Sequence, residues 1–310
     1  MANEKEVRQT FSKLRAVGVL KQKDLTIDDK KFDDGVAYHT VKGSIVLEVN
    51  GSEHRFRIWC DDHYRGLTDS GEHKGNSSYA GIAALVDTPI GTTIDLNIKA
   101  ERFNDYVGKD NKLHSVDDIS VDRAKACDSE AQHMFEGKLE GVVYNIRPEI
   151  VQEQETGRLI VTLIGVGYGQ KALPHTLYVS ADDASYFEQT YNAGDCVTFD
   201  IEVASNTYGA VEQNTGWGKK ARVNSGFTRI EWTITGGDDA YDEERVDNKG
   251  NKLYIPPTDI KNLMEVRKTM LEQIEKEGYK GNSKDNGAKG AGLKAMNKNN
   301  FDLKDVDCPF

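Results

Sequence analysis

The sequence has few of the residues that build disulfide frames, metal clusters or membrane segments. The four cysteines are far apart in the chain and form no CxxC pair: Cys60, Cys127, Cys196 and Cys308. This spacing favours reduced, mostly buried thiols over disulfides or a zinc cluster. The nearest metal half-site, Cys60-Asp61-Asp62-His63 with His73 beyond it, falls short of the four converging ligands that zinc needs. We therefore expect no metal and no cofactor.

Long apolar runs are also missing. No stretch approaches the ~18 consecutive apolar residues of a transmembrane helix. The opening MANEKEVRQTFSK carries charges but not the apolar core of a secretory signal. With 29% charged residues and a mean hydropathy of −0.62, the 310 residues predict a cytoplasmic protein large enough for two domains.

An excess of positive charge, the usual sign of a nucleic-acid partner, is missing as well. Acidic residues outnumber basic ones by 51 to 40, which makes the net charge −11. Residues 1–127 are nearly balanced, with 21 acidic and 19 basic side chains. Exposed charges are screened beyond a Debye length of ~10 Å, so local patches decide phosphate binding more than the total does.

Strand patterns dominate as far as residue 235. In VKGSIVLEVNGSEHRFRIWC, residues 41–60, Asn50-Gly51 separates two alternating runs and predicts a tight hairpin. Alternation places His54, Phe56, Ile58 and Cys60 on one side of the second strand. It leaves Arg55, Arg57 and Trp59 together on the other side.

Two pairs of similar segments indicate an internal repeat. SKLRAVGVL at 12–20 resembles GKLEGVVYN at 137–145, and GTTIDLNIKA at 91–100 resembles GDCVTFDIEVA at 194–204. Each half has about five short strands, with a short helix or loop between the third and fourth. This pattern predicts an all-β fold of two OB-fold-like Greek-key barrels. A pair of β-sandwiches is the alternative, although an immunoglobulin-like sandwich needs about seven strands.

The chain changes character after the second barrel. Ile260, Leu263, Met264, Arg267, Leu271 and Ile274 follow the spacing of an amphipathic helix that ends at Gly278. We expect its apolar stripe to dock on the second barrel. The later residues offer too little apolar surface to offset ordering entropy and should be disordered. The predicted parts are a first barrel (1–127), a second barrel (128–237), an acidic connector with the helix (238–278), and a disordered linker with an acidic tip (279–310).

The Arg55, Arg57 and Trp59 face is the first candidate binding surface. Such a face can be an ordinary solvated strand surface. However, cations that follow a phosphate backbone and aromatic rings that stack on bases are what single-stranded nucleic acid requires.

The loop between the last two strands of each half is the second candidate, because in OB-folds this loop flanks the ligand groove. In the first half it reads FNDYVGKDNKLH and offers Phe103, Tyr106, Lys109 and Lys112. In the second half it reads NTYGAVEQNTGWGKKARVNSG and offers Tyr208, Trp217, Lys219, Lys220 and Arg222. Five further residues could extend the path, but each alone is more often a barrel-surface or core residue: Tyr38, Lys42, Tyr144, Arg147 and Tyr168.

Catalytic patterns are weak, and we do not expect an enzyme. A two-metal nuclease would use paired aspartates, and the sequence has three such pairs: Asp61-Asp62, Asp117-Asp118 and Asp182-Asp183. However, Asp pairs at strand ends are usually turn residues. GVGYG at 165–169 lacks the GxxxxGK[ST] spacing of a phosphate loop.

The last ten residues, FDLKDVDCPF, form an acidic segment ending in Pro-Phe after a Gly/Asn/Lys-rich tether. This arrangement resembles the C-terminal tip of bacterial single-stranded DNA-binding proteins. Asp305, Asp307, Pro309 and Phe310 match that tip, and Asp302 fits its acidic run loosely. Cys308 stands where the family commonly has an aliphatic residue, and Lys304 interrupts the acidic run.

The resemblance implies that the tip docks replication, recombination and repair proteins through the terminal phenylalanine and its carboxylate. The two barrels and the single long helix are more similar to a bacteriophage-encoded single-stranded DNA-binding protein than to the one-barrel, tetrameric cellular kind. We therefore expect sequence-tolerant binding of single-stranded DNA, with partners recruited by the tip. The alternatives are a β-rich interaction or virion component and a metal-dependent nuclease on an OB scaffold.

Overall fold

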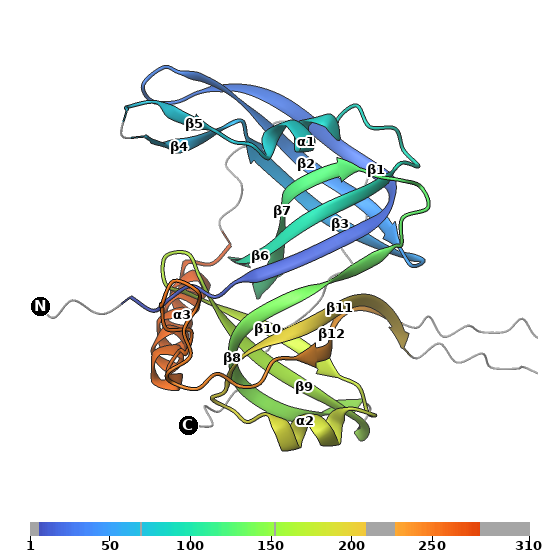
Figure 1. Ribbon diagram of the computed structural model, residues 1–310, viewed down its shortest axis with the longest axis vertical. Helices are drawn as coiled ribbons and strands as arrows, with labels where there is room; N and C mark the ends of the chain where they lie inside the picture. Colours follow the sequence, from blue (N-terminus) through green and yellow to red (C-terminus); the bar gives the residue numbers. More distant parts are fainter. Residues whose placement is uncertain (1–5, 69, 152, 209–226, 280–310) are drawn as a thin grey trace, which may run out of the picture.

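The computed structural model describes residues 6–68, 70–151, 153–208 and 227–279, and most of them lie in strands arranged as two barrels (Figure 1). The first barrel contains β1 (Ser12–Lys31), β2 (Ala37–Val49), β3 (Ser52–Asp61), β6 (Thr93–Val107) and β7 (Leu113–Ala126). The second contains β8 (Met134–Val151), β9 (Gln154–Gly167), β10 (Lys171–Val179), β11 (Cys196–Tyr208) and β12 (Phe227–Gly237). The remaining elements are β4 (His63–Leu67), β5 (His73–Gly75), α1 (Tyr79–Ala84), α2 (Ala184–Thr190) and α3 (Pro257–Glu277).

Each barrel closes through the same set of strand pairings. In the first, the order is β1-β2-β3-β7-β6, and β6 pairs back with β1. In the second, the order is β8-β9-β10-β12-β11, and β11 pairs back with β8. Only the third and fifth strands of each barrel pair in parallel, and a short helix precedes the fourth. This is the five-stranded Greek-key topology of the OB-fold, as the sequence pattern predicted.

The predicted hairpin at Asn50-Gly51 is present. Both residues have positive φ, 49° and 81°, and Val49 pairs with Ser52. Positive φ at both central positions defines the type I′ turn that suits the twist of the two strands. The turn sets the register of β2 and β3, so it also sets which side of β3 faces the core.

The first strands of the two barrels pair with each other along a seam. Lys13 lies opposite Lys138, while Ser12 pairs with Leu139 and Leu14 pairs with Gly137. Ser12 and Gly137 are equivalent in the sequence repeat, as are Leu14 and Leu139. A local two-fold symmetry axis therefore passes through the seam between Lys13 and Lys138. The second pair of similar segments is also equivalent in the structure. Residues 91–100 include the start of β6 and residues 194–204 the start of β11, and each of these is the fourth strand of its barrel.

The barrel interiors join into one apolar cluster across this seam. Phe135, at the start of β8, contributes to the interior of the first barrel: its ring lies 5.2 Å from that of His54 and 5.5 Å from that of Phe56. One strand of the second barrel therefore helps to fill the first, which couples the two folding units.

Helix α3 packs on the second barrel, as expected. Ile260, Leu263 and Met264 join a second apolar cluster with residues of β8 and β9 that include Val142 and Ile164. The helix ends at Gly278, whose φ of 66° suits glycine. No helix within the described residues has the length and apolar content needed to cross a lipid bilayer.

Candidate nucleic-acid interface

The outer face of β3 carries the predicted trio. His54, Phe56, Ile58 and Cys60 are buried, whereas Arg55, Arg57 and Trp59 are exposed, so the predicted division of faces is confirmed. Trp59 has 50% of its surface exposed. An indole held half in water on a rigid strand leaves ring surface available for stacking.

Trp59 lies beside two lysines, Lys30 of β1 and Lys42 of β2. The Lys30 ammonium lies 4.5 Å from the centroid of the Trp59 ring, a cation–π distance. Lys42 pairs with Trp59 across β2 and β3, and its ammonium forms an ion pair with Asp28. That hydrogen bond lowers the pKa of the Asp28 carboxyl, which therefore stays ionised at neutral pH. One of the two lysines beside the indole is thus held by a carboxylate from β1.

A shallow hollow of about 310 Å³ opens on this face, lined by Asp24, Thr26, Lys42, Gly43, Arg57, Ile58 and Trp59. Gly43 explains how β1 and β2 approach so closely there. Its φ is 132°, and a Cβ at this position would lie 1.9 Å from the Asp24 carbonyl oxygen. Arg55 is oriented by a 2.8 Å hydrogen bond from its Nη2 to the Ser44 hydroxyl. We refer below to Lys30, Lys42, Arg55, Arg57 and Trp59 together as the barrel-1 face.

The connection between β1 and β2 is held by stacked rings. Phe32 stacks on Tyr38 at 4.1 Å between centroids and on His73 at 3.8 Å. His73 also lies 3.1 Å from the Asp34 carboxylate through its Nε2. This loop, which flanks the ligand groove in OB-folds, is therefore fixed against the β4–β5 hairpin. Sequence reasoning missed the stack because its three members lie on separate elements.

The first candidate loop is shorter than the sequence suggested. Strand β6 continues to Val107 and β7 begins at Leu113, so Phe103 and Tyr106 lie within β6 and not in a loop. The strands extend because their pairing continues past the barrel, from Phe103 opposite Asp117 to Val107 opposite Leu113. Tyr106 is 42% exposed and stacks on His114 at 5.4 Å.

Lys109 and Lys112 are exposed in the turn between these strands. The predicted loop residues of the first barrel thus form a two-stranded arm with two cations at its tip. Of Phe103, only the backbone is described.

The second candidate loop falls on residues 209–226, so Trp217, Lys219, Lys220 and Arg222 lie outside the described residues. Tyr208 ends β11, and only its backbone is described. The acidic tip with Asp302, Asp305, Asp307, Pro309 and Phe310 also lies outside them. The proposed roles of these residues remain predictions from the sequence.

The face of the second barrel that corresponds to the β3 surface is largely covered. On one part α3 packs against Ile164, Val166 and Ala172 of β9 and β10. Tyr144, considered as a possible ligand contact, is 5% exposed and belongs to the same cluster. Tyr38 is also buried, at 7% exposed. The strand surface that is open in the first barrel is therefore occupied by the chain itself in the second.

An ion-pair network occupies another part of the second barrel. Arg229 bonds to Glu149 at 2.7 Å and to Glu231, and Arg158 bonds to Glu231 at 2.8 Å. Both carboxylates are buried, and both guanidinium groups lie over the ring of Tyr178, at 5.0 Å for Arg158 and 4.5 Å for Arg229. Burial opposes the charge on Arg229, but the hydrogen bonds from its guanidinium to the two glutamates raise its pKa overall. These arginines are matched by carboxylates within the protein.

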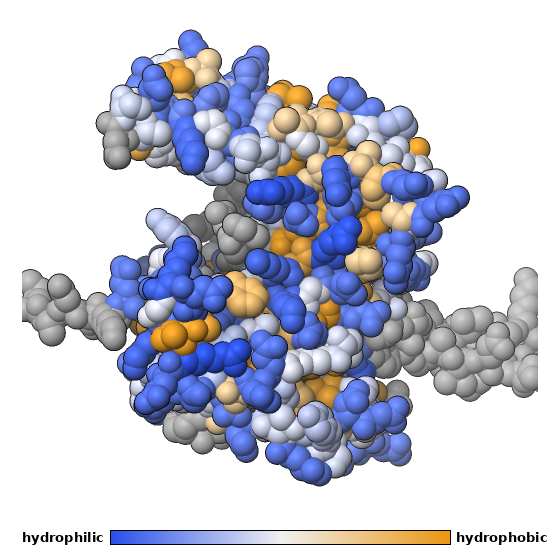
Figure 2. Space-filling model, viewed as in Figure 1, coloured by the Kyte–Doolittle hydropathy of each residue, from blue (hydrophilic) through white to orange (hydrophobic). Residues whose placement is uncertain are grey.

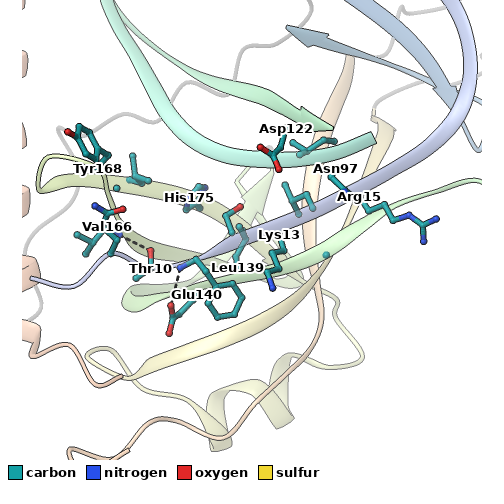
Figure 3. A pocket seen from close by; sticks show the side chains of 18 of the residues that line it. Thr10, Lys13, Arg15, Asn97, Asp122, Leu139, Glu140, Val166, Tyr168 and His175 are labelled. Carbon is teal, nitrogen blue, oxygen red and sulfur yellow. Dashed lines mark hydrogen bonds between the residues drawn. The ribbon is translucent and has the colours of Figure 1, made fainter. Parts of the chain in front are cut away.

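A groove of about 560 Å³ lies where the two barrels meet, and sequence reasoning did not identify it (Figure 3). Lys13 and Arg15 of β1, Asn97 of β6 and Tyr168 of the β9–β10 turn contribute to its lining. Tyr168, which sequence reasoning had weighed only as a lone residue, is 84% exposed. In the close view Tyr168 and Arg15 lie toward opposite ends of the groove (Figure 3).

A second hollow of about 380 Å³ adjoins this groove and shares Arg15, Asn97 and Arg123 with it. Lys125 and Asp95 complete its polar lining. The hydrogen bond from Arg15, joined by Lys125, holds the pKa of the Asp95 carboxyl below its ordinary value. The available sequence signal was a pair of cations two residues apart on a strand: Lys13 with Arg15 and Arg123 with Lys125, the spacing also seen in Arg55 with Arg57.

The cysteines and acidic pairs form no metal site within the described ranges. No group of three or more His, Cys, Asp and Glu side chains there is arranged to hold an ion. Cys60 is buried, and desolvation raises the pKa of its thiol to about 11. Asp62 instead accepts hydrogen bonds from the Nδ1 atoms of His39 and His63, each at 2.8 Å.

Comparison with known families and structures gives a family assignment. The model of the YorF family matches residues 11–277, so the chain belongs to that family. No curated protein matches the chain.

Solved structures with a similar arrangement include two forms of the single-stranded DNA binding protein from Thermus aquaticus. A deletion mutant is 12% identical with a TM-score of 0.40, and the wild-type protein is 11% identical with a TM-score of 0.38. Each match covers 78% of this chain and 98% of the other. What the barrel-1 face binds must follow from its own side chains.

Proposed function

We propose that the protein binds single-stranded DNA with little sequence preference and protects it. The observation that carries this proposal is the barrel-1 face, where an indole half exposed to solvent shares an open OB surface with four cationic side chains. Unpaired DNA presents phosphates and the flat faces of bases, so cations and aromatic rings together match both.

The energetics are consistent with an acidic protein doing this work. Stacking of a base on an aromatic side chain contributes about 1–3 kcal/mol, so a few contacts suffice for useful affinity. The net charge of −11 belongs to the whole chain, whereas phosphates at the barrel-1 face interact mainly with charges within a Debye length of ~10 Å. Asp28 on the same face lowers the affinity and keeps Lys42 in place.

The finer parts of the proposal rest on the sequence of the last ten residues. We propose that the protein acts in DNA replication, recombination or repair in a bacterial cytoplasm, as a bacteriophage-encoded protein. Asp302, Asp305, Asp307, Pro309 and Phe310 would recruit other proteins to the coated strand: the ring would enter an apolar pocket and the carboxylates a basic rim. Because the tip belongs to the same chain as the DNA-binding face, it raises the local concentration of the recruited protein at the strand. The proposed activity is binding, with no catalytic step.

The test is a titration of the full chain with oligo-dT, followed by tryptophan fluorescence and repeated at increasing salt. A protein that binds the DNA is expected to show quenching of tryptophan fluorescence and an affinity that falls steeply with salt. The fall is expected because the protein's cationic side chains release salt cations from the DNA phosphates on binding. A duplex of equal length should bind much more weakly, since its bases cannot stack on the indole. Absence of binding at low salt would overturn the proposal and favour a barrel that binds protein. Shortening of the oligonucleotide when Mg²⁺ is added would indicate a nuclease.

A further inference from the structure

The groove between the barrels carries a row of polar and cationic side chains across three neighbouring strands. Asn97 of β6 pairs with Arg15 on one side and with Arg123 on the other. Arg15 and Arg123 are exposed at 51% and 66% of their side-chain surface. Neighbouring strands lie about 4.8 Å apart, so this row forms a compact cationic strip on the outside of the first barrel. Lys125 extends the strip along β7, with 70% of its side chain exposed.

The strip is continuous with the barrel-1 face. Strand β7 lies between β3 and β6, and Arg57 of β3 is paired in register with Ser120 of β7. Three residues further along β7 is Arg123, which opens onto the groove. The outer surface therefore leads from Arg57 through Ser120 to Arg123 and Arg15 without leaving adjacent strands.

Aromatic rings accompany the cations at the far side of the groove. Tyr168 is among the most exposed large side chains of the molecule, at 84%, and Phe11 is 40% exposed with the Lys13 ammonium 6.0 Å from its ring centroid. Two contacts fix the segment that carries Phe11. Its backbone N–H donates to Glu140 at 3.0 Å, and Glu140 is held by Arg8 at 2.7 Å. The ring is thus presented by a tethered backbone.

Carboxylates accompany the strip. Asp122 and Glu136 line the groove, and Asp95 accepts hydrogen bonds from Arg15 at 2.9 and 3.0 Å and lies 3.2 Å from the Lys125 ammonium. Asp122 lies 3.9 Å from Arg123, a distance at which an exposed pair contributes little. Much of the surface seen in Figure 2 is hydrophilic, and hydrophobic groups form smaller patches on both the upper and the lower part of the molecule. What distinguishes the groove from this general surface is its concave shape, its strip of cations and its two exposed rings.

Resting on the proposed function, we infer that the groove between the barrels is a second contact region for the same single strand. The strand leaves the barrel-1 face across β7, passes Lys125 in the adjoining hollow and enters the groove. There Arg15 and Arg123 contact phosphates and Tyr168 stacks on a base. The second barrel thereby contributes to binding through the β9–β10 turn, although its own strand face is covered by α3 and by the ion-pair network. A strand that is long enough contacts both barrels of one chain.

The test compares oligo-dT of about 6, 10, 16 and 24 nucleotides, because OB folds bind about 4–16 nucleotides each. The test variant is Arg123→Glu combined with Tyr168→Ala. The matched control is Lys249→Glu combined with Tyr186→Ala, a charge reversal and a ring removal at exposed positions outside the groove. Thermal unfolding of both variants should equal that of the wild-type protein.

The affinity of the wild-type protein is expected to increase with oligonucleotide length until the strand covers both the barrel-1 face and the groove. The control variant should show the same increase. The groove variant should bind the shortest oligonucleotide within about twofold of wild type but lose about fivefold or more on the longest, the loss expected for one stacking contact. Retention of the whole length-dependent gain by the groove variant would overturn the inference and leave the proposed function intact. A wild-type protein that binds no oligonucleotide of any length would overturn both.

Discussion

The guanidinium group of Arg267 on α3 grips the carboxylate of Asp105 on β6 with two hydrogen bonds, of 2.7 and 2.9 Å. The Ser115 hydroxyl of β7 lies 3.1 Å from the same guanidinium. Arg267 and Asp105 have only 6% and 4% of their side chains exposed. Because α3 packs on the second barrel and β6 belongs to the first, this buried pair joins the two barrels at a place distant in sequence from the β1–β8 seam.

Removing one partner of this pair should destabilise the protein strongly. Arg267→Ala leaves the Asp105 carboxylate buried without its partner. This loss is expected to lower the free energy of unfolding by about 3–5 kcal/mol. Denaturant unfolding of Arg267→Ala, Asp105→Ala and the double variant measures the coupling between them. The double variant should be less destabilised than the sum of the single variants. Strict additivity would show that the contact does not connect α3 to the arm.

A glycine at the seam offers a second test of how the barrels are joined. A Cβ on Gly137 would lie 2.0 Å from the Lys13 carbonyl oxygen and 2.7 Å from the Leu14 Cα, both backbone atoms that cannot move aside alone. Gly137→Ala should therefore separate β1 from β8 and cost about 1–3 kcal/mol, the usual range for overpacking. Gly75→Ala is the control, because nothing lies within 4 Å of its Cβ position. Equal melting temperatures for the two variants would contradict the close approach at the seam.

Two buried histidines should make the protein less stable in mild acid. Burial lowers the pKa of both His54 and His175 from 6.5 to about 4. The folded state therefore holds the neutral rings, and between pH 6.5 and 4 the unfolded chain binds more protons than the folded one. Stability from this source is complete above pH 6.5 and is lost as the pH falls through 4, by about 3 kcal/mol for each ring.

The variant His54→Leu separates this effect from the titration of carboxylates in the same range. His54 is 3% exposed and packs edge-on against Phe135, so leucine fits an apolar site. The free energy of unfolding, measured by denaturant at pH 7, 5.5 and 4, should decrease less for His54→Leu than for the wild-type protein. Parallel pH profiles would indicate that His54 accepts a proton in the folded state.

The local features of the fold could be read from the sequence, because they depend on neighbouring residues. Alternation in residues 54–60 separated the core side of β3 from the Arg55, Arg57 and Trp59 side, and Asn50-Gly51 predicted the turn. The stripe on 260–274 predicted α3 and included Arg267. The stripe did not show that Arg267 has a partner on β6, since periodicity identifies a face and not what lies against it.

Features that depend on which strands become neighbours were missed. Nothing in the alternation of Lys13 and Arg15 places them beside Arg123, because that row exists only once β6 lies between β1 and β7. The sequence offered a candidate loop in each half and predicted that the helix docks on the second barrel, but it did not show which strand surface the helix covers. The strand surface of the second barrel carries the apolar residues Ile164 and Val166 of β9, which the barrel alone would have left exposed. Helix α3 covers this surface.

Removal of residues 301–310 should separate DNA binding from partner recruitment. The segment carries Asp302, Asp305 and Asp307, so its loss removes negative charge that competes with DNA phosphates. Affinity for oligo-dT should stay equal or increase, while recovery of replication proteins on the DNA-bound protein should be abolished. Phe310→Ala serves as a milder variant that keeps all three aspartates. A marked loss of DNA affinity in the shortened chain would refute the role proposed for the segment.

Stacking on Trp59 should be separable from the charge around it. Trp59→Ala removes the ring and is expected to weaken binding of short oligo-dT by about 1–3 kcal/mol, while Trp59→Phe should restore part of that loss. Neither change alters a charge, so the slope of log affinity against log salt should stay the same. Arg55→Gln with Arg57→Gln should instead lower that slope by about 0.7 for each phosphate that the protein no longer neutralises.

Fluorescence can follow the arginine variant, because Trp59 is still present, and anisotropy of a labelled oligonucleotide can follow all three. If Trp59→Ala changed the salt slope as much as the double arginine variant does, the ring would act by positioning Lys30, whose ammonium lies 4.5 Å from it, and not by stacking on a base. A normal slope with weakened affinity is the result that the half-exposed indole predicts, because a π-face contributes contact area to a base but releases no counterion.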